Sequence, residues 1–180
     1  MMVPAKSRAT ATFIPPPIFL SGSSLQYVEN FKYLGHIITA DFKDDQDIMR
    51  ELRNINIRGN MLIRRFGFLP IEVKCELFKT YCYPMYTCTL WSTYTQASIN
   101  RLRVAYNNIM RRLAYVPPWG SASFMFGMLG VRSFQEIIRT HSYSLMQRID
   151  SSPNDFIITL SCSDAALVSA QRRHWTQVLY

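Results

Sequence analysis

The sequence is poor in the residues that build metal, cofactor and redox sites. Its four cysteines show no Cys-x-x-Cys spacing and have no paired histidines beside them, so a structural zinc site is not expected. The three histidines lie far apart in the sequence, and no glycine-rich loop of the kind that cradles a phosphate is present. We therefore expect no catalytic residue, no metal site and no cofactor in this chain, and cysteines that are buried and reduced.

Long apolar runs are also missing. No stretch approaches the roughly 20 apolar residues that a membrane-spanning helix needs, and the apolar segment from Phe13 to Leu20 is broken by three prolines. We expect neither a signal peptide nor a transmembrane segment. The sequence thus favours an intracellular protein, in the nucleus or the cytoplasm, with no membrane partner.

Acidic residues are scarce: twelve Asp and Glu stand against twenty Lys and Arg, which gives a net charge of +8. The excess is concentrated between Arg50 and Arg148, where fourteen basic residues face four acidic ones. Fifteen of the twenty basic residues are Arg, whose flat guanidinium suits phosphate contacts and stacking on bases. Nucleic acid is therefore favoured as a partner over acidic lipid.

The acidic residues that do cluster are Asp41, Asp44, Asp45 and Asp47. They precede a segment with a helical pattern, where carboxylates complement the positive end of the helix dipole. No strand-turn-strand with adjacent metal-binding aspartates accompanies them. We expect a structural role for these residues, at a helix N-terminus.

The hydrophobic pattern changes along the chain. Residues 1–17 hold four prolines and little pattern, which predicts an unstructured leader. Residues 18–40 are rich in β-branched and aromatic residues, which predicts short hairpin strands. Residues 41–150 have a helical period, and residues 151–180 are expected to form a partly helical C-terminal extension. The predicted fold is α+β, mainly α, with a small antiparallel β-hairpin followed by a bundle of four to five helices.

The first two helices of the bundle have clear sequence signals. An apolar seam at steps of three and four residues predicts the first; it consists of Ile48, Leu52, Ile55, Gly59, Leu62 and Phe66. Pro70 is expected to open the second. The residues expected to face inward from the second helix are Val73, Leu77, Phe78 and Tyr81.

Two later helices are predicted from their caps. Ser98 is expected to cap the third, which stops before Pro117. The run from Ser133 to Glu136 forms a capping box, which starts a fourth helix that runs to about Asp150.

A glycine, Gly35, lies inside the strand-forming run 31–38. Glycine weakens a strand, so its presence indicates either a β-bulge or the close approach of a ligand or another backbone. The residues leave both interpretations open.

Basic residues fall on one side of two predicted helices. At 100° per residue, Arg50, Arg53 and Arg64 lie within about 60° of one another, opposite the apolar seam. The polar side of the third helix holds Arg101, Asn108, Arg111, Arg112 and Tyr115. This mixture suits contacts with a nucleic-acid backbone and with stacked bases; the alternative is an ordinary solvated helix face.

Several short motifs follow one another in order. They are FKYLG at 31–35 with Ile37, the pair 47–48 with Arg50, NMLIRRF at 60–66, the pair 73–74, LFKTYC at 77–82, the pair 90–91 and LRVAYNN at 102–108. As an ordered series across about residues 20–150, they resemble the region after the polymerase palm in the reverse transcriptases of non-LTR retrotransposons, the LINE-like elements.

In that family a Tyr-Leu-Gly hairpin ends the palm as the primer grip, and the following helices form the thumb, which holds the template–primer duplex. The resemblance implies a palm end at residues 18–40 and a thumb-like domain at residues 41–150. Tyr33, Leu34 and Gly35 match the primer grip, and Arg64 and Arg65 match a basic pair in the first thumb helix. With the arginines inferred from helix faces, the expected nucleic-acid-binding residues are Lys32, Tyr33, Gly35, Arg50, Arg53, Arg64, Arg65, Arg101, Arg111, Arg112 and Tyr115.

The chain also departs from the family pattern. The catalytic Tyr-x-Asp-Asp motif, which binds Mg²⁺ in the parent enzymes, is absent, and the run 118–120 replaces a more basic loop. We therefore expect a fragment of an RNA-directed DNA polymerase that is itself no enzyme. Its expected partners are an RNA or DNA template–primer duplex and the missing palm portion. A stand-alone basic nucleic-acid-binding module and a structural or protein-interaction bundle, including a decayed relic without function, stay open as alternatives.

Overall fold

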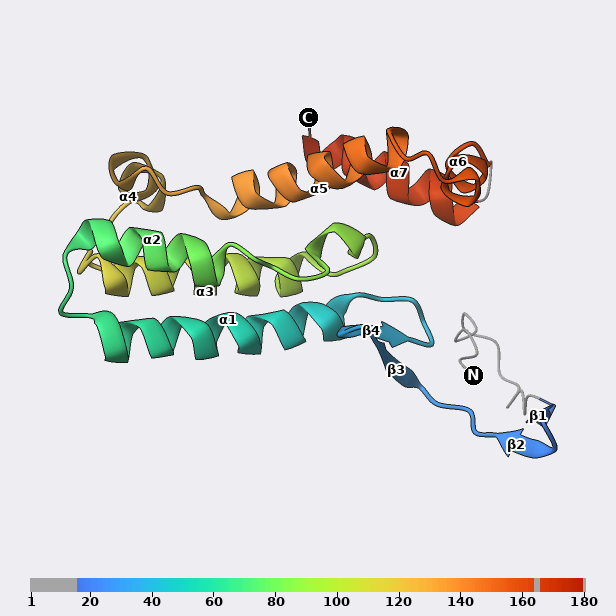
Figure 1. The fold of residues 1–180 in the computed structure, drawn as a ribbon. Helices are drawn as coiled ribbons and strands as arrows, with labels where there is room; N and C mark the ends of the chain where they lie inside the picture. Colours follow the sequence, from blue (N-terminus) through green and yellow to red (C-terminus); the bar gives the residue numbers. More distant parts are fainter. Residues whose placement is uncertain (1–15, 164–165, 180) are drawn as a thin grey trace.

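The computed structural model describes residues 16–163 and 166–179 (Figure 1). Within these ranges, two antiparallel hairpins precede seven α-helices and one short 3-10 helix. The strands are β1 (Ile18–Leu20), β2 (Ser23–Leu25), β3 (Asn30–Tyr33) and β4 (His36–Thr39). The helices are α1 (Asp45–Phe66), α2 (Ile71–Cys82), the 3-10 helix η1 (Cys88–Leu90), α3 (Gln96–Leu113), α4 (Ala122–Leu129), α5 (Phe134–Asp150), α6 (Asp155–Ser161) and α7 (Ala166–Leu179). The predicted α+β, mainly α class is confirmed.

The described part of the chain has one more hairpin than the sequence predicts. Residues 41–150 hold five α-helices, as the predicted four to five allow, and α6 and α7 lie in the C-terminal segment expected to be partly helical. The short helices α4 and α6, of eight and seven residues, are not predicted individually, because they are too short to show a full amphipathic repeat. Of the leader predicted at residues 1–17, residues 1–15 lie outside the described residues.

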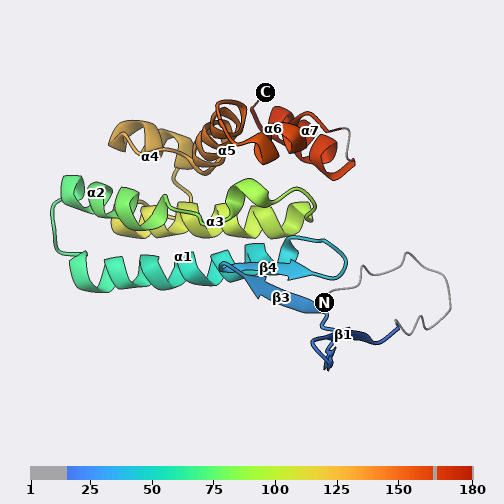
Figure 2. The ribbon, with the colours of Figure 1, turned by 45° about the vertical axis from the view of Figure 1, so that its right-hand side comes forward.

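The helices form three layers (Figures 1 and 2). Helix α1 packs against α2 and α3, and α5 packs on the other side with η1, α3, α6 and α7. The apolar core lies between these layers, and Ile48, Ile55, Phe78, Leu102 and Tyr106 have no exposed surface. Apolar side chains at helical spacing thus drive the packing, as the seam of α1 predicts.

Two details of the helix predictions are wrong. Val73 and Tyr81 of α2 do not face the apolar core of the molecule, because they are 43% and 41% exposed. Ser98 is not the cap of α3; Thr95 is, since its side chain accepts a hydrogen bond from the Ser98 amide. The buried residues of α2 are Lys74, Cys75, Phe78 and Cys82.

The capping box that starts α5 is confirmed. The Ser133 side chain accepts from the Glu136 amide, and the Glu136 carboxylate accepts from the Ser133 amide at 2.6 Å.

Gly35 belongs to a turn and not to a strand. Leu34 and Gly35 have φ values of +46° and +86° and connect β3 to β4, in which Tyr33 pairs with His36. Two-residue hairpin turns need such positive φ values, which glycine adopts without steric cost. A Cβ atom on Gly35 would also lie 3.1 Å from the Tyr86 ring. The β-bulge interpretation is therefore wrong, and the close neighbour of Gly35 in this structure is a side chain of the same protein.

The cysteines agree only partly with expectation. All four are free, and Cys75, Cys82 and Cys88 are buried, whereas Cys162 is exposed. Burial raises the pKa of Cys82 and of Cys88 to about 12, so these thiols stay protonated at neutral pH.

Candidate nucleic-acid interface

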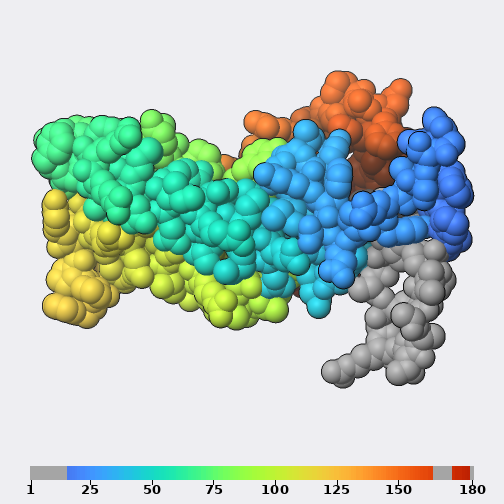
Figure 3. All heavy atoms as spheres, turned by 90° about the horizontal axis from the view of Figure 1, so that it is seen from below, coloured from blue at the N-terminus to red at the C-terminus, as the bar shows by residue number. Residues whose placement is uncertain are grey.

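Helices α1 and α3 pack side by side (Figure 3). A groove lies along the solvent-facing side of α3 where it borders α1. The groove, called here the α1–α3 groove, is lined by Asn56 of α1 and by Ala97, Asn100, Arg101, Val104, Ala105, Asn108, Ile109 and Arg112 of α3. The helices approach closely beneath it, because a Cβ atom on Gly59 would lie 2.6 Å from the Ile109 side chain.

The lining combines guanidinium and amide groups with an apolar floor. Arg101 and Arg112 are exposed, and the Arg112 guanidinium donates to the Asn60 side chain of α1 at 3.1 Å, across the two helices. None of the lining residues is acidic. Within the described ranges, neither guanidinium takes part in an ion pair. The groove is thus a positively charged surface whose charge is not neutralised by the protein.

A row of polar residues on α1 borders the groove. Arg53, Asn56, Asn60 and Arg64 follow one another at steps of three, four and four residues, which places them on one side of the helix. All four are exposed. With Arg101, Asn108 and Arg112 on α3, the face combines charged and amide groups on both helices.

Arg111 and Tyr115, which the sequence groups with Arg101 and Arg112, make contacts within the protein. The Arg111 guanidinium donates to the Gly120 carbonyl at 3.0 Å. The Tyr115 hydroxyl donates to the Gly67 carbonyl at 2.9 Å, and the Lys74 ammonium lies 4.4 Å from the centre of its ring. Arg111 therefore ties the C-terminal end of α3 to the segment before α4, and Tyr115 ties it to the end of α1.

The remaining predicted residues lie elsewhere. Arg65 is exposed but lies about 100° around the helix from Arg64. Lys32 and Tyr33 are exposed on β3, and Gly35 is in the hairpin turn. The structure brings together Arg53, Arg64, Arg101 and Arg112 and leaves the hairpin residues at the N-terminal end of α1.

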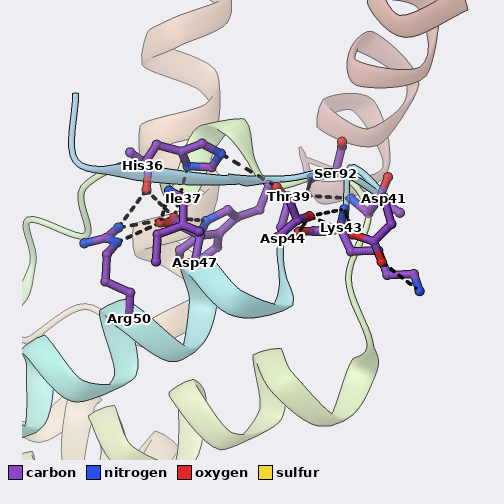
Figure 4. A network of polar contacts seen from close by, with 12 residues as sticks. His36, Ile37, Thr39, Asp41, Lys43, Asp44, Asp47, Arg50 and Ser92 are labelled. Atoms are coloured by element: carbon purple, nitrogen blue, oxygen red, sulfur yellow. Dashed lines mark hydrogen bonds and ion pairs between the residues drawn. The ribbon is translucent and has the colours of Figure 1, made fainter. Parts of the chain in front are cut away.

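Arg50 is part of an internal network centred on Asp47 (Figure 4). Asp47 has no exposed surface. Its carboxylate accepts from the Arg50 guanidinium at 2.7 Å, the Ile37 amide at 2.9 Å, the Thr87 hydroxyl at 2.7 Å and the Trp91 indole at 2.8 Å. The Arg50 side chain is only 15% exposed. The interpretation of Arg50 as part of the free basic face of α1 is therefore not supported by its contacts.

The neighbouring aspartates make similar connections. The Asp44 carboxylate accepts from the amides of Ser92 and Thr93, at 2.8 and 2.9 Å. The Asp45 carboxylate accepts from the amide and hydroxyl of Thr95. The predicted structural role holds, but these carboxylates join β4, α1 and the segment before α3 and do not cap their own helix, since Asp44 makes no side-chain cap bond.

The network controls the ionisation of its carboxylates. Burial alone would raise the pKa of Asp47, but contacts from His36, Arg50, Thr87 and Trp91 outweigh burial and hold this pKa well below its usual range. The His36 Nδ1 atom lies 3.1 Å from the Asp47 carboxylate. Burial raises the pKa of Asp44, in spite of the two amides that it accepts from. Asp47 is therefore an ionised carboxylate with donors around it.

Sequence reasoning missed the asparagines of the groove. Asn60 begins the motif at 60–66 but is not among the predicted binding residues, and Asn56 and Asn100 belong to none of the motifs. The regular spacing of Asn56 and Asn60 with Arg53 and Arg64 would have indicated those two.

Among residues 16–163 and 166–179, no group of three or more His, Cys, Asp or Glu side chains is placed to hold a metal ion. No helix in the described ranges has the length and apolar character needed to cross a bilayer. Comparison with models of protein families, with curated proteins and with solved structures finds no match for this chain.

Proposed function

We propose that this chain holds a template–primer duplex for a polymerase, as the thumb does in the LINE-like reverse transcriptases that its motifs resemble. The observation that carries the proposal is the α1–α3 groove, where arginine and asparagine side chains meet solvent with no acidic residue in the lining. In this proposal the chain is not the catalyst, and another segment would supply the metal-binding aspartates.

The chemistry of the groove suits a nucleic-acid backbone. Guanidinium groups bind phosphate oxygens through paired hydrogen bonds, and asparagine amides contact phosphate and sugar. The row from Arg53 to Arg64 is about 16 Å long at 1.5 Å per residue, so its two arginines can reach separate phosphates of one strand. A duplex backbone would lie along the helices, with Arg53 and Arg64 on one side and Arg101 and Arg112 on the other.

The β3–β4 hairpin offers a second surface for contact. It exposes Phe31, Tyr33 and Leu34, which are 51%, 58% and 72% exposed. Asp47 fixes this hairpin to α1 through the Ile37 amide. We assign its exposed apolar side chains to contact with the palm portion, since grouped apolar surface commonly marks an interaction site.

A binding titration with matched variants tests the proposal. The purified chain is titrated against a fluorescently labelled RNA–DNA template–primer duplex and followed by anisotropy. Replacing both Arg101 and Arg112 by Ala removes two charged contacts and should weaken binding about tenfold or more. The control is the double variant Arg132→Ala with Arg148→Ala, which removes two exposed arginines outside the groove and should retain most of the affinity.

Equal losses in the two double variants would mean that only net charge matters and would contradict the proposed site. Equal affinity for duplex and single strands would favour a general nucleic-acid-binding module. Primer extension by the chain alone should give no product; templated, metal-dependent extension would contradict the assigned role.

A further inference from the structure

A second concavity lies on the other side of α3 from the α1–α3 groove. It is a cavity of about 210 Å³ between the segment before α3, α3 itself, α5 and α7. We call it the α3–α5 pocket. Asn100 lines both the pocket and the groove, so the two concavities flank the same turn of α3.

Aromatic side chains line part of the pocket. Trp91 and Phe134 are 2% and 4% exposed and show little of their surface, and the Trp91 indole N–H is already donated to Asp47. The more exposed aromatic residues are Tyr94 and His174. Tyr94 and His174 also line the pocket and contact each other edge to face, with ring centres 5.7 Å apart. Such walls suit a planar aromatic group.

Polar groups around these walls can donate and accept hydrogen bonds. Gln96, Asn100 and Gln135 bring amides, and Arg103 and Arg139 bring guanidinium groups. Arg139 also donates through Nε to the Val178 carbonyl at 3.1 Å, which ties α5 to α7 beside the pocket. None of the lining residues is acidic. Amides match the edge of a nucleobase, which has both donors and acceptors, and guanidinium groups match the phosphate attached to it.

Size and chemistry together restrict the ligand class. The volume is below the roughly 300 Å³ at which pockets for drug-sized molecules begin, which leaves room for one small planar group. An acyl chain would leave the amides and guanidinium groups without partners. A free phosphate would make no use of the aromatic walls.

We propose that the α3–α5 pocket takes one unpaired nucleobase from the end of a strand that is held in the α1–α3 groove. This inference rests on the proposed function, because the strand must first be bound in the groove. The backbone would cross α3 near Asn100, and the base beyond the last pair would lie against Tyr94 and His174. Stacking of a base on aromatic side chains contributes to affinity without requiring a particular sequence.

The test compares three duplexes with the purified full chain. One is blunt, one carries a single-stranded overhang with the fluorescent base 2-aminopurine, and one carries the same overhang with an abasic site. We expect the base-containing overhang to bind at least about fivefold more tightly than the other two. We also expect 2-aminopurine fluorescence to be quenched on binding.

Two variants locate the effect. Gln135→Trp fills the pocket from an exposed position on α5, and Arg103→Ala removes a guanidinium group from its lining. Both should abolish the advantage of the overhang and keep the affinity for the blunt duplex, and circular dichroism and thermal unfolding check that each variant folds.

The outcomes separate the two proposals. Binding of the blunt duplex without an overhang advantage would overturn the pocket assignment and leave the groove in place. An overhang advantage that is equal with the abasic strand, or unchanged in both variants, would also overturn it. Failure to bind any duplex would overturn both proposals.

Discussion

Helix α1 takes part in two regions where charge is used in opposite ways. On the side that faces the segment after α2, Arg50 pairs with Asp47 and Glu51, and Arg58 pairs with Glu51. On its outer side, Arg53 and Arg64 are exposed and border a groove without acidic residues. The same residue type in the same helix is thus structural in one place and available to a ligand in the other.

The difference arises from position around the helix. Arg50 lies toward Tyr86 and Thr87, to which its guanidinium also donates, and it is enclosed by the hairpin and the segment after α2. Arg53, three residues later, is exposed to solvent. The comparison shows that a helical wheel identifies a polar side but does not say which of its charges the rest of the chain will neutralise.

The largest effect is expected at Asp47. Replacing Asp47 by Asn keeps the side-chain volume but removes the negative charge that pairs with Arg50. The new amide N–H group would also face the N–H donors of Ile37, Arg50 and Trp91, to which it cannot hydrogen-bond. Breaking a buried ion pair in this way should lower the free energy of unfolding by about 3–5 kcal/mol, measured by urea denaturation. The matched control is Asp41→Asn, an exposed carboxylate, which should change it by less than about 1 kcal/mol. Similar losses in the two variants would contradict the central role of Asp47.

The stabilising role of ionised Asp47 also predicts how the free energy of unfolding depends on pH. Because the pKa of Asp47 is lower in the folded protein than in the unfolded chain, where it is about 3.9, its ionisation stabilises the fold above that value. This contribution is lost as pH falls below about 4. The raised pKa of Asp44 acts in the opposite direction. We expect the unfolding free energy of the wild type to fall in acid more steeply than that of Asp47→Asn, and parallel curves would contradict the assignment.

A smaller effect is expected where α1 and α3 meet. In Gly59→Ala, the helix-forming gain of about 1 kcal/mol should be outweighed by overpacking against Ile109, which costs about 1–3 kcal/mol. Thermal unfolding should show a net loss of about 1 kcal/mol, with weaker duplex binding if the helices separate. Gly127→Ala in α4 is the control, because a Cβ atom there meets nothing within 4 Å and should not destabilise. A stabilised Gly59→Ala would show that the contact relaxes easily.

Much of the fold follows from the sequence, because it depends on local signals. The seam of α1, the capping box of α5 and the hairpin region all have residues whose spacing or conformation is specific. The aspartate network was predicted only as a helix N-terminus, since its donors Thr87, Trp91 and Thr95 are some 40 to 50 residues away in the sequence. Of the candidate site, the arginines of α1 and α3 were predictable from periodicity. The internal partners of Arg50, Arg111 and Tyr115 were not, because tertiary packing decides them.

The central claim is that the α1–α3 groove contacts the nucleic-acid backbone through its own arginines. The most direct measurement is the salt dependence of duplex binding by the wild type and by the variant with Arg101 and Arg112 replaced by Ala, whose free energy of unfolding should change by no more than about 0.5 kcal/mol. If Arg53, Arg64, Arg101 and Arg112 each neutralise one phosphate, the plot of log affinity against log salt should have a slope of about −3.6, and the variant should lose about 1.8 of it. A flat wild-type response, or the same slope in both proteins, would contradict the account.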